Sequence, residues 1–238
     1  AWFREIPRSV ENNPELMGKT IDTWVIADDQ VDQYMKNHYT KLKDKEKKLI
    51  EQMKENGNAE LKFNEIFFKN GDSKIPEYAG IKSAVIGSVF TLIITMAFAF
   101  PIGVMTAIYL EEFAQDNKFT QIVEININNL AAIPSILFGL LGLAIFINLF
   151  GLPRSSPLVG GLTLALMTLP IIIVSSRAAL RAVPDSIRQA AYGLGLTKIE
   201  VTRDHVLPLA FPGILTGSII GLAQAIGETA PLIIIGMI

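Results

Sequence analysis

Two polar residues stand in the last apolar stretch of the chain and are the first candidates for chemistry. Glu228 is a carboxylate among apolar neighbours, and Gln224 precedes it by four residues, which places both on one face of a helix. A carboxylate inside a membrane helix costs about 2.5–3.5 kcal/mol, so it is by default a functional candidate. A bare carboxylate repels anions, so we expect Glu228 to pair with a basic group or to help a gate. A packing role beside a kink at Pro231 is the alternative.

Two arginines could hold an anion near the same path. Arg177 and Arg181 follow the third apolar run, although anchoring at the membrane surface explains them nearly as well. Thr229 follows Glu228 directly. The candidate pathway residues are therefore Gln224, Glu228, Thr229, Arg177 and Arg181.

A short segment between the third and fourth apolar runs carries paired helix signals. Pro184 ends the preceding helix, and Ser186 followed by Gln189 fits a capping box that would open a short helix. Gly193 and Gly195 are natural stops for that helix.

A second helix is expected directly afterwards. Thr197 and Glu200 form another capping-box pattern, and this helix should finish before Pro208. The two helices with their glycine turn predict a compact, protruding helical hairpin to which a partner protein can bind. The alternative is an ordinary amphipathic loop on the membrane surface. The residues expected to contact the partner are Arg188, Gln189, Ala190, Ala191, Gly195, Thr197 and Glu200.

Glycines recur every four residues in the fourth apolar run, at Gly213, Gly217 and Gly221. Small residues at this spacing let two membrane helices approach closely. We therefore expect helix packing there.

The composition argues against several other classes of protein. There is no cysteine, and His38 and His205 are too far apart in the predicted topology to share a site. Residues 193–198 lack the spacing of a phosphate-binding loop, so ATP would have to be hydrolysed on another chain. A net charge of −2 gives no basic face for nucleic acid. No cofactor or metal site is expected on this chain.

Charge divides the chain into two parts. Residues 1–80 hold 28 of the 44 charged side chains, and uncharged runs of 22–29 residues follow. About 20 apolar residues cross a bilayer, so residues 81–238 predict a polytopic helical domain. Its expected spans are about 83–110, 127–150, 157–177 and 208–235, with a cytoplasmic loop over 181–207.

The basic residues of that loop place it in the cytoplasm by the positive-inside rule and residues 1–80 outside it. Export of such a domain requires an earlier span, which we expect to be missing from this sequence. Within it, Asp28 or Asp29 should cap a helix that runs to Gly57. Leu61, Phe63 and Phe67 with Asn70-Gly71 favour a strand and turn, so we expect a small α+β domain.

Several blocks of sequence resemble the permease subunits of ABC importers. The segment Gln189-Ala190-Ala191, Gly195 and the closing His205-Val206-Leu207-Pro208 resemble their EAA loop, with Gln in place of Glu and His in place of Ile. Residues 100–112, 129–139 and 227–232 resemble the phosphate-specific (PstA-type) permeases over the whole of 81–238.

This resemblance implies a type I importer fold in the bacterial inner membrane. The implied partners are a second permease subunit, a cytoplasmic ATPase dimer that binds ATP, and an extracytoplasmic phosphate-binding protein. The implied activity is phosphate translocation by alternating access, with ATPase coupling through the loop.

The chain departs from that family pattern at positions where arginine is common: it has Gln224 and Val174 there. Without these arginines, either the partner permease supplies the positive charge or the path is lined differently. An importer permease for another oxyanion, such as sulfate or molybdate, is an alternative, although the Gly-Glu-Thr-Ala-Pro block at residues 227–231 favours phosphate. A secondary anion transporter is a further alternative, because proline-broken helices also suit such proteins.

Overall fold

The computed structural model describes residues 11, 13–18, 20 and 24–237, and within them it is built of helices without strands. The chain divides into two compact units, Ala1–Ile86 and Gly87–Ile238. Residues 1–10 of the expected outer domain lie outside the described part.

The N-terminal unit contains short helices where one long helix was expected. Asp28 caps α2 (Asp29–Met35) by accepting a hydrogen bond from the Gln30 amide, as predicted. The chain then breaks at Asn37, whose φ of 59° lies in the left-handed region. Helix α3 (Asp44–Glu55) follows, and Gly57 turns the chain at φ +75°.

The strand expected around residues 61–67 is wrong. Residues 61–64 have no regular secondary structure, and α4 (Glu65–Lys69) is helical. Asn64 caps this helix by accepting from the Phe67 amide, which is a local signal that the strand prediction overlooked. A 3₁₀ turn (Pro76–Tyr78) leads to the next long helix, and the α+β description therefore fails for the described residues.

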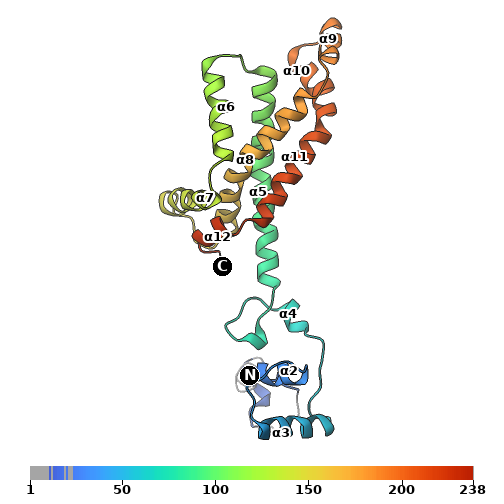
Figure 1. The fold of residues 1–238 in the computed structure, drawn as a ribbon, viewed down its shortest axis with the longest axis vertical. Helices are drawn as coiled ribbons and strands as arrows, with labels where there is room; N and C mark the ends of the chain where they lie inside the picture. The colour runs from blue at the N-terminus through green and yellow to red at the C-terminus, as the bar shows by residue number, and fades with distance from the viewer. Residues whose placement is uncertain (1–10, 12, 19, 21–23, 238) are drawn as a thin grey trace. The chain divides into compact units, whose positions relative to one another are not determined.

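The C-terminal unit is a helical bundle centred on α8 (Pro157–Arg181), as Figure 1 shows. Helices α6 (Lys118–Ala131), α7 (Ser135–Gly142) and α11 (Leu207–Gly227) contact it. Within the described residues, α8 and the helical stretches Lys82–Phe113 and Lys198–Gly227 are long and apolar enough to span a membrane. The first of these stretches comprises α5 (Lys82–Ile108) and a π-helical turn (Tyr109–Phe113).

The expected span at 127–150 is not one straight helix. Helix α6 and the stretch Ser135–Leu149, in which α7 continues as a π-helix, meet at a bend of 103°. The bend falls at Pro134, which caps α7 at ψ 133°. A residue before proline is pushed out of the helical region, which a count of uncharged residues cannot reveal.

The expected span at 208–235 also breaks. Helix α11 ends at Gly227, Glu228 is extended at φ −89° and ψ 118°, and α12 (Ala230–Ile234) starts afresh. Glu228 therefore caps a helix end instead of lying in the middle of a helix. At the other end, α10 (Lys198–Glu200) does not finish before Pro208. It continues into α11 because the intervening turn, Val201–Val206, is π-helical.

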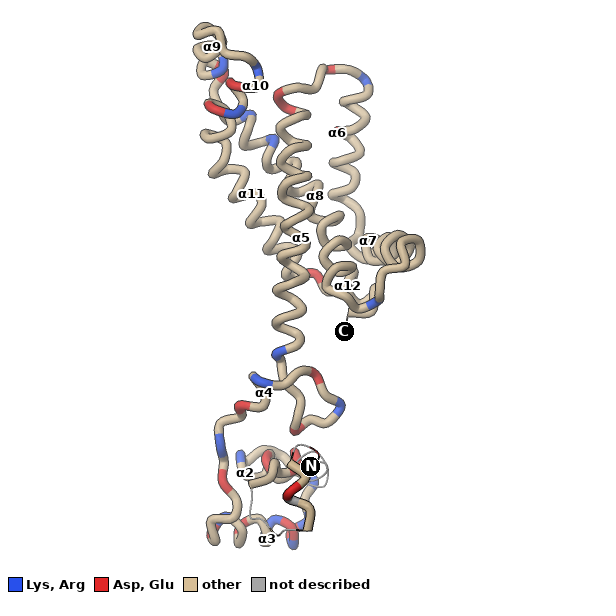
Figure 2. Tube along the Cα trace, turned by 180° about the vertical axis from the view of Figure 1, so that it is seen from behind, with Lys and Arg blue, Asp and Glu red and all other residues tan. Residues whose placement is uncertain are grey.

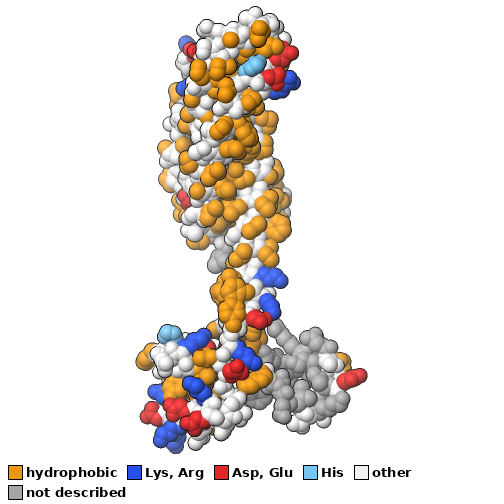
Figure 3. All heavy atoms as spheres, turned by 90° about the vertical axis from the view of Figure 1, so that its right-hand side faces the viewer, with side chains coloured by type: hydrophobic (Ala, Val, Ile, Leu, Met, Phe, Trp, Pro, Cys, Tyr) orange, Lys and Arg blue, Asp and Glu red, His pale blue; other side chains and the backbone are white. Residues whose placement is uncertain are grey.

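Exposed apolar side chains cover the outside of the bundle. Val89, Phe90, Ile219 and Ile220 are each half exposed or more, and hydrophobic side chains spread over the bundle in Figure 3. Such a surface suits lipid contact.

The glycines of α11 lie against α8. A Cβ built on Gly217 would come within 2.1 Å of the Ser175 Oγ and 2.4 Å of its Cβ, and one on Gly213 within 2.7 Å of the Ala179 Cβ. Gly221 is less crowded, at 3.4 Å from Ile172. These glycines therefore let α11 and α8 approach closely, as small residues do between membrane helices.

We predict that Gly217→Ala destabilises the bundle by about 1–3 kcal/mol, because the added methyl group must push α8 away. Adding Ser175→Gly should restore most of the stability, since the nearest remaining atom would be the residue 175 Cα at 3.6 Å. Thermal unfolding of the detergent-solubilised protein measures both effects.

Gly227→Ala is the matched control, because a Cβ there has no neighbour within 4 Å. Equal melting temperatures for Gly217→Ala and Gly227→Ala would contradict this account of the helix contact.

Candidate functional site

A helical hairpin lies at one end of the bundle, formed by α9 (Asp185–Gly193), a turn and α10 (Figure 1). We call residues 185–200 the hairpin. The expected capping box at Ser186 is wrong, since Pro184 occupies the N-cap without a side-chain hydrogen bond. The second box is confirmed: the Thr197 amide donates to the Glu200 Oε2 at 2.7 Å.

The glycine turn joins the two helices. Gly195 has φ +84° with open space where a Cβ would stand, a conformation that costs other residues energy. Among the residues expected to contact a partner, Gln189, Ala190, Gly195 and Thr197 are exposed, whereas Ala191 is buried in the core. Leu194 and Ile199 add exposed apolar surface, with 81% and 65% of each residue accessible. Sequence reasoning did not single out these two.

Arg188 points into the protein instead of outward. Its Nη2 donates to the Glu112 Oε1 at 2.8 Å and to the Leu180 carbonyl at 3.0 Å, and its Nη1 donates to the Val183 carbonyl at 2.7 Å. The side chains of Arg188 and Glu112 are only 16% and 6% exposed. The Glu112 carboxylate raises the pKa of Arg188, so the guanidinium stays charged.

This one side chain therefore joins three elements. It belongs to the hairpin, it caps carbonyls at the C-terminal end of α8, and it pairs with the π-helical turn that follows α5. Free carbonyls at a helix end need such donors. Arg188 acts as a tie between the hairpin and the bundle.

Arg177 and Arg181 are also paired with carboxylates. Arg177 donates to Glu111 at 3.2 Å and to Glu124 at 2.6 Å, and Arg181 donates to Glu111 at 2.7 Å. We refer to these residues together with Arg188 and Glu112 as the arginine–glutamate cluster. It holds three positive and three negative groups, and the exposed Asp185 lies a further 3.2 Å from Arg188. Charged residues gather at this end of the bundle in Figure 2.

The glutamates of the cluster were missed as functional candidates. Glu111 and Glu112 were seen only as part of a sequence block, and Glu124 was not considered. Their partners lie 53–76 residues away along the chain. The available signal was the number of arginines: three of them near one end of the membrane spans predict carboxylate partners elsewhere in the chain.

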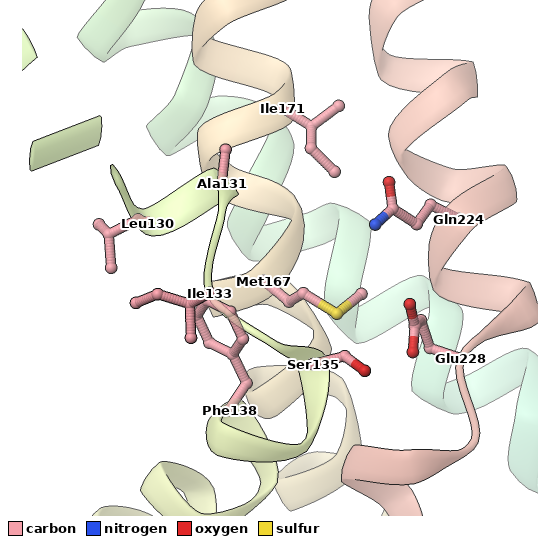
Figure 4. Close-up of a pocket in the computed structure, with 9 residues that line it drawn as sticks. All are labelled: Leu130, Ala131, Ile133, Ser135, Phe138, Met167, Ile171, Gln224 and Glu228. Carbon is pink, nitrogen blue, oxygen red and sulfur yellow. The ribbon is translucent and has the colours of Figure 1, made fainter. Parts of the chain in front are cut away.

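Gln224 and Glu228 line a cavity of about 160 Å³ in the bundle (Figure 4). Ser135, at the start of α7, and Met167 of α8 face the same space. The other lining residues are Leu130, Ala131, Ile133, Phe138 and Ile171. Ser135, Gln224 and Glu228 thus bring polar side chains to a small cavity whose other lining residues are apolar.

The structure does not bring the candidate arginines to this cavity. Neither Arg177 nor Arg181 lines it, and Thr229 does not line it either. Within the described part of the chain, Glu228 has no ion-pair partner. The described residues also hold no group of three His, Cys, Asp or Glu side chains suited to a metal ion.

Several permease proteins are similar to this chain over two thirds or more of its length. The probable ABC transporter permease protein YqgI of Bacillus subtilis is 33% identical over 75% of this chain and 60% of its own length. The phosphate transport system permease protein PstA of Mycobacterium leprae is 36% identical over 67% of this chain and 52% of its own. The chain thus spans about half the length of the curated relatives it matches.

A chain from a structure of the MetNI methionine ABC transporter in inward-facing conformations has the same fold, with a TM-score of 0.53 and 23% identity over 60% of this chain and 69% of that one. Residues 3–45 match a domain of unknown function (DUF3333). Residues 99–238 match the model of the binding-protein-dependent transport system inner membrane components. The chain therefore belongs to this family of membrane permeases, whose bundle carries the hairpin and the cavity described above.

Proposed function

We propose that the chain is the membrane-spanning permease subunit of an ATP-driven importer of inorganic phosphate. The family assignment supports the permease role, and relatives named as phosphate permeases support the substrate. The observation that carries the coupling part of the proposal is the hairpin, exposed on its outer side and tied to the bundle through Arg188.

The hairpin suits contact with a separate ATPase. Its exposed residues Gln189, Gly195 and Leu194 offer a mixed polar and apolar surface to a partner. When an ATPase dimer closes, a push on the hairpin would pass through Arg188 to the end of α8 and to the turn after α5. The bundle would thereby shift between outward-open and inward-open states.

The cavity at Gln224 and Glu228 is the proposed part of the substrate path. Arg177 and Arg181 are better explained as structural members of the cluster, because Glu111 and Glu124 neutralise them. Phosphate is an anion and Glu228 repels it, so we propose that a second permease subunit supplies positive charge across the path. Thr229 does not line the cavity, so its only link to the proposed path is that it follows Glu228 in the sequence.

The proposed partners are this second permease subunit, a cytoplasmic ATPase dimer that binds ATP, and an extracytoplasmic phosphate-binding protein. The chain would lie in the bacterial inner membrane, with the hairpin in the cytoplasm and residues 1–80 on the opposite side. A secondary anion transporter has no need of the hairpin, which makes that alternative less favoured.

We predict that membrane vesicles holding the complete transporter take up labelled phosphate only when ATP is supplied, and that excess sulfate does not compete. Uptake of each labelled anion with and without ATP measures this directly. Sulfate uptake in place of phosphate would refute the substrate and leave the importer role intact. Uptake that persists without ATP, driven by an ion gradient, would refute the importer role itself.

We predict that Gly195→Ala uncouples ATP hydrolysis from transport. A Cβ at φ +84° costs about 1–2 kcal/mol, which is roughly a 5- to 30-fold shift in the population of the turn. The amount of phosphate transported per ATP hydrolysed should therefore fall several-fold.

Gly193→Ala is the matched control for this substitution. Gly193 lies two residues away in the last turn of α9, and a Cβ there also meets open space. Gly195→Asn should retain more coupling, because asparagine tolerates the left-handed region. A normal transport ratio in Gly195→Ala would show that the turn conformation is irrelevant to coupling.

A further inference from the structure

Three phenylalanines gather on the surface of the N-terminal unit without entering a core. Phe63 stacks on Phe68 with ring centroids 5.7 Å apart, and Phe67 meets Phe68 edge-on at 5.2 Å. Phe63 is 78% exposed, Phe68 55% and Phe67 41%. We call them the phenylalanine cluster. Large aromatic side chains grouped in this way usually mark an interaction surface.

The cluster is attached to the start of the first membrane helix. The Ile81 amide donates to the Phe67 carbonyl at 2.9 Å, and the Lys82 amide donates to the Asn70 carbonyl at 3.1 Å. These amides belong to the beginning of α5, where donors lack partners within the helix. The end of α4 therefore caps α5, and the attachment consists of backbone contacts.

Close packing fixes this attachment. A Cβ on Gly80 would lie 2.4 Å from the Asn70 carbonyl oxygen and 2.8 Å from that of Phe67. The Asp72 amide also donates to the Ser83 Oγ at 3.0 Å. The phenylalanine cluster can therefore move little relative to the first turn of α5.

The membrane boundary must lie at that first turn. Lys82 is the last charged residue before the uncharged run of α5, and Val85 and Ile86, one turn later, are already exposed apolar residues. Lysine is typical of the ends of membrane helices, and phenylalanine is among the residues that interfacial helices bury at the boundary between headgroups and acyl chains. A phenylalanine cluster held beside Lys82 is thus at the depth of the lipid headgroups.

We propose that the phenylalanine cluster is a lipid contact that seats α4 in the interfacial layer of the membrane. Phenylalanine rings gain free energy there because their apolar surface leaves water. Residues 61–82 carry four lysines and three carboxylates, so the contact requires apolar burial and does not depend on anionic lipid. The proposal holds whichever side of the membrane the N-terminal unit occupies.

The absence of cysteine from the sequence allows single spin labels to test this contact. We would place a nitroxide at Phe68→Cys, and in a separate protein at Phe63→Cys, in the full chain reconstituted into phosphatidylcholine nanodiscs. Lys54→Cys, on exposed α3 and outside the cluster, is the aqueous control. Power saturation with oxygen and with a water-soluble nickel complex measures the depth of each label.

Both cluster labels should collide more with oxygen and less with nickel than the Lys54 label does. The ratio of oxygen to nickel collision rates should therefore be several-fold higher at the cluster. Gly80→Ala, which forces α4 away from α5, should move the Phe68 label towards the aqueous value. Water-like collision at both cluster positions would overturn the proposal. Low collision with both reagents would also overturn it, because it would mean that protein covers the cluster.

Discussion

The partly buried ion pair between Arg188 and the buried Glu112 is the interaction on which the rest of the bundle end depends. Glu112 is buried, so removal of Arg188 would leave an uncompensated carboxylate inside the protein, which costs about 3–5 kcal/mol. Here the same guanidinium also binds the carbonyls of Leu180 and Val183. The hairpin therefore cannot shift away from α8 and the turn after α5 without exposing several polar groups at once.

A second consequence concerns charge along the path. Arg177 and Arg181 were expected to bind an anion, but they form ion pairs with Glu111 and Glu124. These pairs hold helix ends together. The cavity is left with Gln224 and Glu228 as its polar groups on this chain, together with Ser135. A phosphate passing there would meet a carboxylate, which is why the account needs a cation from a second subunit. Specificity for the anion would then belong to the pair of permeases.

The sequence predicted those features that local signals determine. The cap at Thr197, the turn at Gly195 and the helical character of the apolar runs depend on near neighbours and were correct. The bend at Pro134 and the helix end at Glu228 were missed, because the length of an uncharged run does not show a change of direction. The inward turn of Arg188 could not be predicted, since its partner lies 76 residues earlier.

The role of the Arg188–Glu112 pair in coupling can be tested most directly with a complex that carries Glu112→Gln. The measurement is the amount of phosphate transported per ATP hydrolysed. This change keeps the shape of the side chain and removes the charge that holds Arg188. Arg203→Gln is the control, because it breaks an exposed ion pair with Asp204 that involves no residue of the cluster. A complex with Glu112→Gln should transport several-fold less phosphate per ATP hydrolysed, whereas the control complex should have a normal ratio. An unchanged transport ratio in assembled Glu112→Gln complex would contradict this role of the pair.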